Sequence, residues 1–136
     1  MTMDKFRKNN LKCSISTTRM YSTSFSLGVR MLDKAYRDHI YSIYGFVRYA
    51  DEIVDTFFNF DRATLLSEFR EDTYKAIERG ISMNPILDSF QHSVNECKID
   101  RHLIDAFLDS MEMDLNLEVY NRAQLEKYIY GSAEVV

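Results

Sequence analysis

Five polar side chains between residues 40 and 57 recur at the spacing that places them along one side of a helix. They are Tyr41, Tyr44, Arg48, Asp51 and Asp55, separated in turn by three, four, three and four residues. Residues three or four positions apart are neighbours on a helix surface. The spacing therefore predicts one stripe that carries two hydroxyls, a guanidinium and, one turn apart, two carboxylates.

The other residues of 40–57 are mostly apolar, and this predicts a central helix that is covered on most sides. Two carboxylates in such surroundings repel each other and lose hydration unless a cation joins them. Mg²⁺ suits this role because it takes oxygen ligands, commonly one or two carboxylates together with water and substrate phosphates. We therefore predict Asp51 and Asp55 as ligands of Mg²⁺, or alternatively of Mn²⁺, and Arg48 as a contact for phosphate oxygens.

The D-x-x-x-D spacing is weak by itself, because a solvent-exposed helix in which Arg48 pairs with Asp51 or Asp55 would show it as well. The apolar flanks favour the buried alternative. For a second pair, Asp105 and Asp109, we predict a solvated face, since apolar residues mark the other side of that segment.

Two further sets of residues could bind metal. Asp114 lies among apolar residues, which favours a place near a cavity. The histidines His39, His92 and His102 lack the glutamate three residues earlier that di-iron bundles use. We predict that each histidine is at the surface or hydrogen-bonded rather than a ligand.

The elements that position these side chains are predicted to be helices. Gly contributes 4 and Pro 1 of the 136 residues, and 46% are hydrophobic, a balance that disfavours sheets with many tight turns and suits one core. Asp33 is an expected N-cap, and Asn84 is another, with Pro85 in the first turn. The pattern predicts a short amphipathic helix in the first twenty residues, a loop or ragged helix start at 22–26, and helices at 34–57, 61–79, 84–97, 100–118 and from 121 through 136.

Composition narrows the class of protein. The net charge is −4, which disfavours nucleic-acid binding. Cys13 and Cys97 form no C-x-x-C pair, so neither a disulfide framework nor a thiolate zinc site is indicated, and a reducing cytoplasm fits best. Apolar runs are too short for a membrane span, and the first residues lack the apolar stretch of a signal peptide. We expect a cytoplasmic protein.

Four segments, in order and at similar spacing, resemble conserved segments of the squalene/phytoene synthase family. Their amino-acid sequences are similar to those of its bacterial phytoene synthase members. The four segments are residues 22–26, 44–55, 111–115 and 128–133, and the second, YGFVRYADEIVD, resembles the family's first aspartate-rich motif. The resemblance implies an all-α isoprenoid-synthase (terpenoid synthase) helical bundle. Residues 1–136 would be the N-terminal part of a single domain that condenses two geranylgeranyl diphosphates head to head, giving phytoene via prephytoene diphosphate in carotenoid biosynthesis.

The resemblance also implies roles for individual residues. Asp51 and Asp55 would bind Mg²⁺, and Tyr41 and Tyr44 would face substrate. Tyr128 would line the prenyl tunnel or bind diphosphate. The other contacts implied for the prenyl diphosphate substrates are Ser22, Ser24, Ser26 and Arg48 at the diphosphate, Phe25 beside the prenyl chain, and Ser132 and Ala133 in the tunnel wall.

Several alternatives remain open on the sequence. The family's second aspartate-rich motif is missing from the chain, so we expect the 136-residue chain alone to be inactive. Glu134 stands where the family usually has glycine, which leaves the tunnel wall at that position open. Squalene or dehydrosqualene synthesis from farnesyl diphosphate is the nearest alternative. An inactive relative that acts as an assembly subunit and an all-α interaction module with a solvated acidic stripe are the others. The hydrocarbon product makes peripheral membrane contact plausible, and the sequence does not indicate an oligomeric state.

Overall fold

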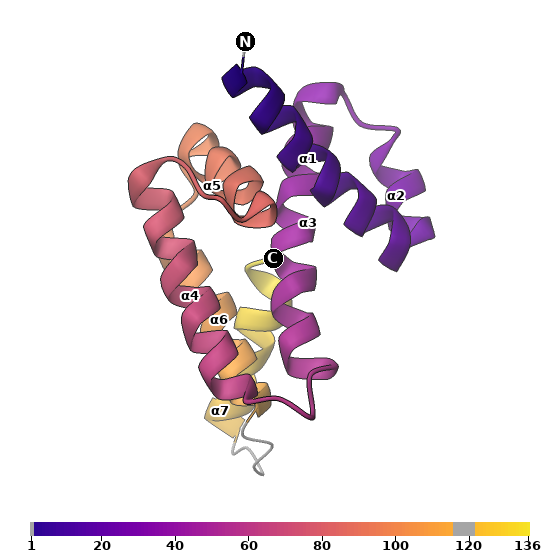
Figure 1. Cartoon of the computed structure of the whole chain (residues 1–136). Coiled ribbons are helices and arrows are strands. Elements are labelled where there is room, and N and C mark those ends of the chain that lie inside the picture. Colours follow the sequence, from indigo (N-terminus) through magenta and orange to yellow (C-terminus); the bar gives the residue numbers. More distant parts are fainter. Residues whose placement is uncertain (1, 116–121) are drawn as a thin grey trace. The chain divides into compact units, whose positions relative to one another are not determined.

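The computed structural model describes residues 2–115 and 122–136, and within these residues every regular element is a helix (Figure 1). The elements are α1 (Thr2–Tyr21), α2 (Thr23–Val29), α3 (Lys34–Asp55), α4 (Arg62–Arg79), α5 (Pro85–Cys97), α6 (Arg101–Leu115), α7 (Arg122–Ile129) and the π-helix η1 (Tyr130–Glu134). The all-α prediction is confirmed. The chain forms two compact units, the first made of Met1–Tyr49 and Asp72–Lys98 and the second of Ala50–Glu71 and Ile99–Val136.

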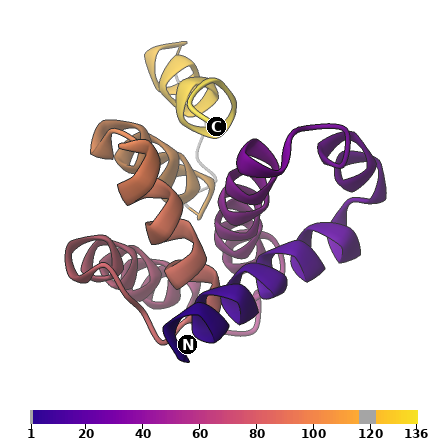
Figure 2. The ribbon, with the colours of Figure 1, turned by 90° about the horizontal axis from the view of Figure 1, so that it is seen from above.

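In the first unit, α1 is a continuous helix of 20 residues rather than the short one predicted (Figure 2). Its buried residues are polar: Asn10, Ser14 and Thr18, at four-residue spacing. Asn10 Nδ2 donates to Asp88 Oδ2 of α5 at 2.8 Å. A Cβ atom added to Gly45 of α3 would lie 2.9 Å from Ser14 Oγ, so α1 and α3 approach closely because Gly45 has no side chain.

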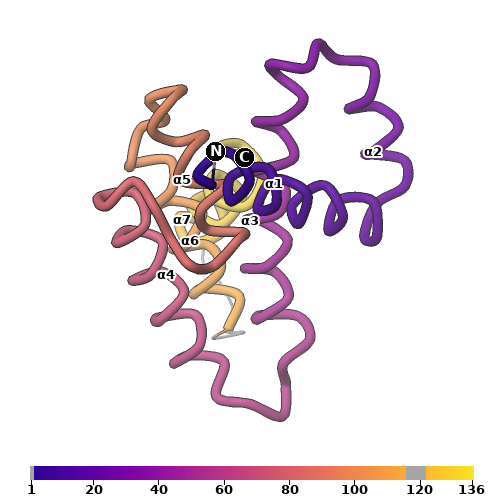
Figure 3. The backbone as a smooth tube through the Cα atoms, turned by 45° about the horizontal axis from the view of Figure 1, so that its top comes forward, coloured from indigo at the N-terminus to yellow at the C-terminus, as the bar shows by residue number. Residues whose placement is uncertain are grey.

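The segment 22–26, predicted as a loop or ragged helix start, begins the short helix α2. Ser22 is its N-cap, and its hydroxyl accepts a hydrogen bond from the backbone N–H of Phe25 at 3.2 Å. After α2 the chain turns back into α3 (Figure 3). Asp33 directly precedes α3 as predicted, but α3 ends at Asp55, two residues earlier than expected.

The first-unit part of α3 packs against α5 through both polar and aromatic contacts. His39 Nδ1 lies 2.7 Å from Ser93 Oγ, and the rings of Phe46 and Phe90 stack with centroids 3.8 Å apart. Asn84 caps α5 by accepting hydrogen bonds from two backbone N–H groups, and Pro85 occupies the first turn, as predicted.

In the second unit, α6 is the central helix. Arg70 of α4 donates to Asp109 at 2.9 Å and lies 3.7 Å from Asp105. It also donates to Glu112 at 3.0 Å. Asp105 and Asp109 keep 40% and 38% of their side-chain surface exposed, which agrees with the predicted solvated face. Their ion pairs with Arg70 of the neighbouring helix are what the sequence did not indicate.

The last segment also differs from its prediction. The α-helix gives way to the π-helix η1 at Tyr130, and regular structure ends at Glu134 instead of continuing to residue 136. A Cβ atom added to Gly131 would lie 2.2 Å from the backbone oxygen of Ala106. Gly131 thus allows η1 to lie against the backbone of α6. The predicted helix 100–118 is observed to Leu115, and its end lies outside the described residues.

Candidate functional site

The carboxylates of the predicted metal pair lie in the last turns of α3. Because α3 is a single helix through Asp55, Arg48, Asp51 and Asp55 lie on successive turns. Asp51 is half-buried and Asp55 is exposed, so the predicted burial of the carboxylate pair is wrong for Asp55, which lies at the very end of the helix. Asp114, predicted near a cavity, is half-buried on α6.

Charge at this end of α3 is unfavourable for the helix itself. The last five residues of α3 include three acids, Asp51, Glu52 and Asp55, and its last turn contains no basic residue. The C-terminal end of a helix carries a partial negative charge, which destabilises nearby carboxylates. A bound cation would relieve both this repulsion and that between the carboxylates.

Arg62 fixes the end of α3, and sequence reasoning missed it. Its Nη1 donates to the backbone oxygen of Val54 at 2.7 Å, and its guanidinium carbon lies 4.6 Å from the centroid of the Phe58 ring. The helix carbonyl that would otherwise be left without a partner is thereby satisfied. The only sequence signal is that Arg62 follows a phenylalanine-rich turn that separates two predicted helices.

Asp61 precedes Arg62 and caps α4. Its carboxylate accepts hydrogen bonds from the hydroxyl of Thr64 at 2.7 Å and from the backbone N–H of Thr64 at 3.2 Å. These two bonds, the side-chain bond first, hold the pKa of Asp61 below its ordinary value. The turn between α3 and α4 is therefore fixed from both sides.

In the first unit, α2 and the end of α1 cover the stripe before Asp51. The rings of Phe25 and Tyr44 stack with centroids 4.9 Å apart, and the guanidinium carbon of Arg48 lies 4.5 Å from the centroid of the Tyr21 ring. The structure thus brings Phe25 to Tyr44. Tyr21 is a further neighbour of Arg48 that sequence reasoning missed, and its position directly before the serine segment was the available signal.

The remaining predicted residues of the first unit differ in exposure. Ser22 is half-buried and its hydroxyl caps α2, Ser24 is exposed, and Ser26 is buried within α2. Tyr41 is only 2% exposed. The roles proposed for these residues toward substrate stay predictions.

The predicted residues of the C-terminal segment lie in the second unit. Tyr128 is half-buried in α7, and its backbone oxygen accepts a hydrogen bond from Ser132 Oγ at 2.8 Å. Ser132 is half-buried and Ala133 is exposed. The structure thus brings Tyr128 and Ser132 together at the junction of α7 and η1, and their roles toward substrate also stay predictions.

Each histidine has a protein partner, as predicted. His39 bonds Ser93, and His92 Nδ1 lies 2.7 Å from Arg7 Nη1. His102 Nε2 lies 3.4 Å from the hydroxyl of Tyr130.

The donor chemistry at the end of α3 fits Mg²⁺. Within residues 2–115 and 122–136, no group of three or more His, Cys, Asp or Glu side chains is arranged to hold a metal ion. Two carboxylates one turn apart match the small number of protein ligands that Mg²⁺ takes when water and phosphate oxygens complete its shell. The three carboxylates at the end of α3 add to this preference for a cation, part of which Arg62 already meets through its hydrogen bond to the Val54 carbonyl.

No helix among the described residues is both long enough and apolar enough to cross a membrane.

Comparison with known proteins gives consistent results. A profile of the family described as squalene/phytoene synthase matches residues 18–136. Presqualene diphosphate synthase of Rhodopseudomonas palustris is 30% identical over 117 residues, covering 84% of this chain and 41% of the relative. A dehydrosqualene synthase crystal structure in complex with ligand aligns with a TM-score of 0.82 at 20% identity, covering 95% of this chain and 45% of that chain.

The chain spans less than half the length of either relative. The structural similarity is to an isoprenoid-synthase helical fold. Because the family profile covers most of its residues, this chain belongs to the squalene/phytoene synthase family.

Proposed function

We propose that this chain supplies the first aspartate motif of an enzyme that condenses two prenyl diphosphates head to head. The observation that carries the proposal is the Asp51 and Asp55 pair, one turn apart in the acidic last turns of α3, in a chain of this family. Prenyl diphosphates are the substrates that such a site would take.

The chemistry begins with loss of diphosphate from one substrate. Its allylic C1–O bond breaks, the electron pair leaves with the diphosphate, and the C2–C3 double bond of the second substrate captures the cation. Loss of a proton then gives a cyclopropylcarbinyl diphosphate. In a second ionisation the remaining diphosphate leaves with its electron pair, and rearrangement of the cyclopropylcarbinyl cation joins C1 to C1′. Loss of a proton from the resulting allylic cation gives a neutral hydrocarbon of the phytoene or dehydrosqualene type.

The residues of α3 would act on the leaving group. Asp51 and Asp55 would hold Mg²⁺, which when bound supplies positive charge to the departing diphosphate oxygens. Arg48 presents a planar guanidinium suited to the same oxygens, and the Tyr21 ring beside it restricts its position. The stacked rings of Phe25 and Tyr44 offer faces that steady an allylic cation.

The length of the substrate distinguishes two versions of the proposal. The resemblance of the four sequence segments to bacterial phytoene synthases favours geranylgeranyl diphosphate as substrate and phytoene as product. The names of both relatives, a presqualene diphosphate synthase and a dehydrosqualene synthase, favour the squalene type and therefore farnesyl diphosphate. We adopt farnesyl diphosphate as the first substrate to test. The reaction could also stop at a product that retains one diphosphate, because the bacterial relative is named a presqualene diphosphate synthase.

The first experiment measures binding by the chain itself. We expect farnesyl thiodiphosphate, which resists ionisation, to bind in calorimetry only when Mg²⁺ is present. Asp51→Asn and Asp55→Asn should each abolish the Mg²⁺ dependence, whereas Asp72→Asn, at an exposed position of α4, should not. Equal binding with and without Mg²⁺ would remove the metal role assigned to the pair.

The second experiment measures turnover. We expect the chain alone to release no diphosphate from either substrate, and a chimera in which it replaces the matching part of the presqualene diphosphate synthase to be active. Release of one diphosphate per product molecule indicates that the reaction stops at the cyclopropylcarbinyl diphosphate. Release of two indicates the complete reaction. An inactive but folded chimera would favour the assembly-subunit alternative.

A further inference from the structure

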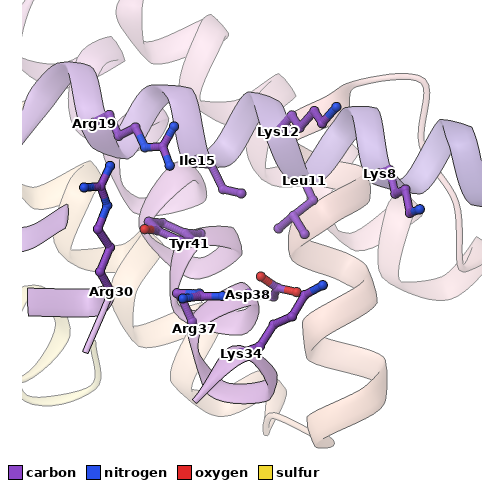
Figure 4. A pocket seen from close by; sticks show the side chains of 10 residues that line it. All are labelled: Lys8, Leu11, Lys12, Ile15, Arg19, Arg30, Lys34, Arg37, Asp38 and Tyr41. Atoms are coloured by element: carbon purple, nitrogen blue, oxygen red, sulfur yellow. The ribbon is translucent and has the colours of Figure 1, made fainter. Parts of the chain in front are cut away.

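The first unit contains a pocket whose lining is dominated by cations (Figure 4). Its volume is about 750 Å³, and it lies between α1, the end of α2 and the start of α3. Six basic residues line it: Lys8, Lys12 and Arg19 from α1, Arg30 after α2, and Lys34 and Arg37 from α3. The figure shows Arg19 and Arg30 reaching toward one another from two different elements.

This concentration of positive charge is unusual for the chain. The net charge of the protein is −4, yet Asp38 is the single acidic residue in the pocket lining. None of the six cations forms an ion pair with a residue in the described part of the chain. Arg70, by contrast, has three carboxylates within 4 Å.

The position of the pocket adds to its preference for anions. Lys34 and Arg37 belong to the first turn of α3, which contains no acidic residue. A helix N-terminus carries partial positive charge, which disfavours cations there. The Asp33 carboxylate directly before α3 offsets part of this charge, and a bound anion would offset more. The pocket and the helix end therefore favour the same kind of ligand.

The remaining lining is apolar or aromatic. Leu11 and Ile15 of α1 are half-buried, and Tyr41 is buried. Arginine guanidinium groups can hold two oxygens of one phosphate, and lysine ammonium groups add point charges. Three arginines and three lysines around an apolar floor suit a doubly or more highly charged phosphate group better than a single carboxylate.

We propose that this pocket binds a phosphate-bearing anion at a site distinct from the Asp51 and Asp55 pair. Two sources share this chemistry, free diphosphate and the phosphate headgroup of an acidic lipid. The proposal does not depend on the proposed function, because it uses neither the aspartate pair nor Mg²⁺.

The test measures binding of inorganic diphosphate to the 136-residue chain by calorimetry, without divalent cations. Lys12→Gln with Lys34→Gln removes two charges from the pocket. Lys5→Gln with Lys127→Gln removes two charges from exposed lysines outside it. We expect the first pair of substitutions to weaken binding roughly tenfold or more, by loss of charge-assisted hydrogen bonds. The second pair should leave binding within about twofold, as for exposed charges.

Three further measurements complete the test. Asp51→Asn with Asp55→Asn should retain diphosphate binding, which separates this proposal from the metal site. Co-sedimentation with phosphatidylcholine vesicles, with and without phosphatidic acid, identifies the source. If the chain binds acidic vesicles and the Lys12 and Lys34 substitutions abolish this binding, the ligand is the lipid headgroup. If the chain binds diphosphate but not the vesicles, the ligand is the free anion. Circular dichroism verifies that each variant is folded.

Two results would overturn the proposal. The first is that neither diphosphate nor acidic vesicles bind. The second is that the pocket variant and the Lys5 and Lys127 control bind equally well, which would reduce the pocket to a solvated basic face.

Discussion

Neutralising Asp55 should stabilise the chain when no metal is present. Asp55 is the last residue of α3 and is exposed, with Asp51 one turn before it and Glu52 three residues before it. Removing a carboxylate from a helix C-terminus gains about 0.3–1 kcal/mol. Removing repulsion from charges three and four residues away gains about 0.2–0.5 kcal/mol each. Arg62, bonded to the backbone oxygen of the preceding residue, attracts the Asp55 carboxylate and reduces this gain. Asp55→Asn should therefore raise the free energy of unfolding by about 1 kcal/mol, the lower part of the summed range.

The assay is thermal unfolding followed by circular dichroism in EDTA, where 1 kcal/mol corresponds to a rise in Tm of about 3–4 °C for a chain of this size. Added Mg²⁺ should then raise the Tm of the wild type, since a ligand that binds the folded state stabilises it by mass action. The variant should show no such rise. The Tm of the wild type is therefore predicted to rise toward that of the variant as the Mg²⁺ concentration increases.

Asp72→Asn is the matched control, because Asp72 is exposed in the interior of α4 and far from a helix end. It should change Tm by less than about 2 °C, as for an ordinary surface substitution, and leave the Mg²⁺ response intact. If Asp55→Asn lowers the Tm in EDTA, the carboxylate has a stabilising partner, and the argument from helix-end charge is wrong.

Three other predictions concern single positions. Asp88 is fully buried and accepts three hydrogen bonds, so Asp88→Ala should lower the free energy of urea unfolding by about 3–5 kcal/mol, whereas a loss below about 1 kcal/mol would contradict this network. Gly131→Ala should weaken packing of η1 on α6, because the new Cβ would clash with Ala106, and faster amide exchange in η1 would verify it. Asp61 should titrate below its ordinary pKa in NMR, and Thr64→Val should move that pKa upward. Because the folded pKa is lowered, this cap stabilises the fold above the unfolded pKa of about 4, and its contribution is lost as the pH falls through the folded value.

The length of α1 illustrates what hydrophobic periodicity does not detect. Its buried residues Asn10, Ser14 and Thr18 are small or polar, so an apolar stripe is missing although the four-residue spacing is present. The helix is held by the Asn10 to Asp88 hydrogen bond and by close approach at Gly45. Such a face depends on partners distant in sequence.

Helices with apolar faces or capping residues were predicted more accurately. The Asn84–Pro85 start of α5 follows from local rules alone. The π-helix at Tyr130 does not, because its geometry depends on contact of Gly131 with the α6 backbone. Boundaries set by tertiary contact were therefore the ones that the sequence analysis missed.

The candidate site shows the same division. The spacing of Arg48, Asp51 and Asp55 is a property of one helix and can be derived from the sequence. Tyr21 and Arg62 are different, since their roles depend on where α1 ends and how the α3–α4 turn folds. The basic pocket was missed because its cations come from three segments, each of which looks like a solvated helix face.

Helix α3 is charged against its own dipole at both ends. Its first turn carries Lys34 and Arg37, with Asp33 directly before it as the nearest acid, and its last turns carry three acids, with Arg62 of α4 as the neighbouring cation. Either pattern costs stability, and favourable caps would be easy to obtain by substitution. A cation at the last turns and an anion at the first turn each offset one of these costs. Both proposed ligands therefore follow from the charge distribution of one helix, and each can be tested without the other.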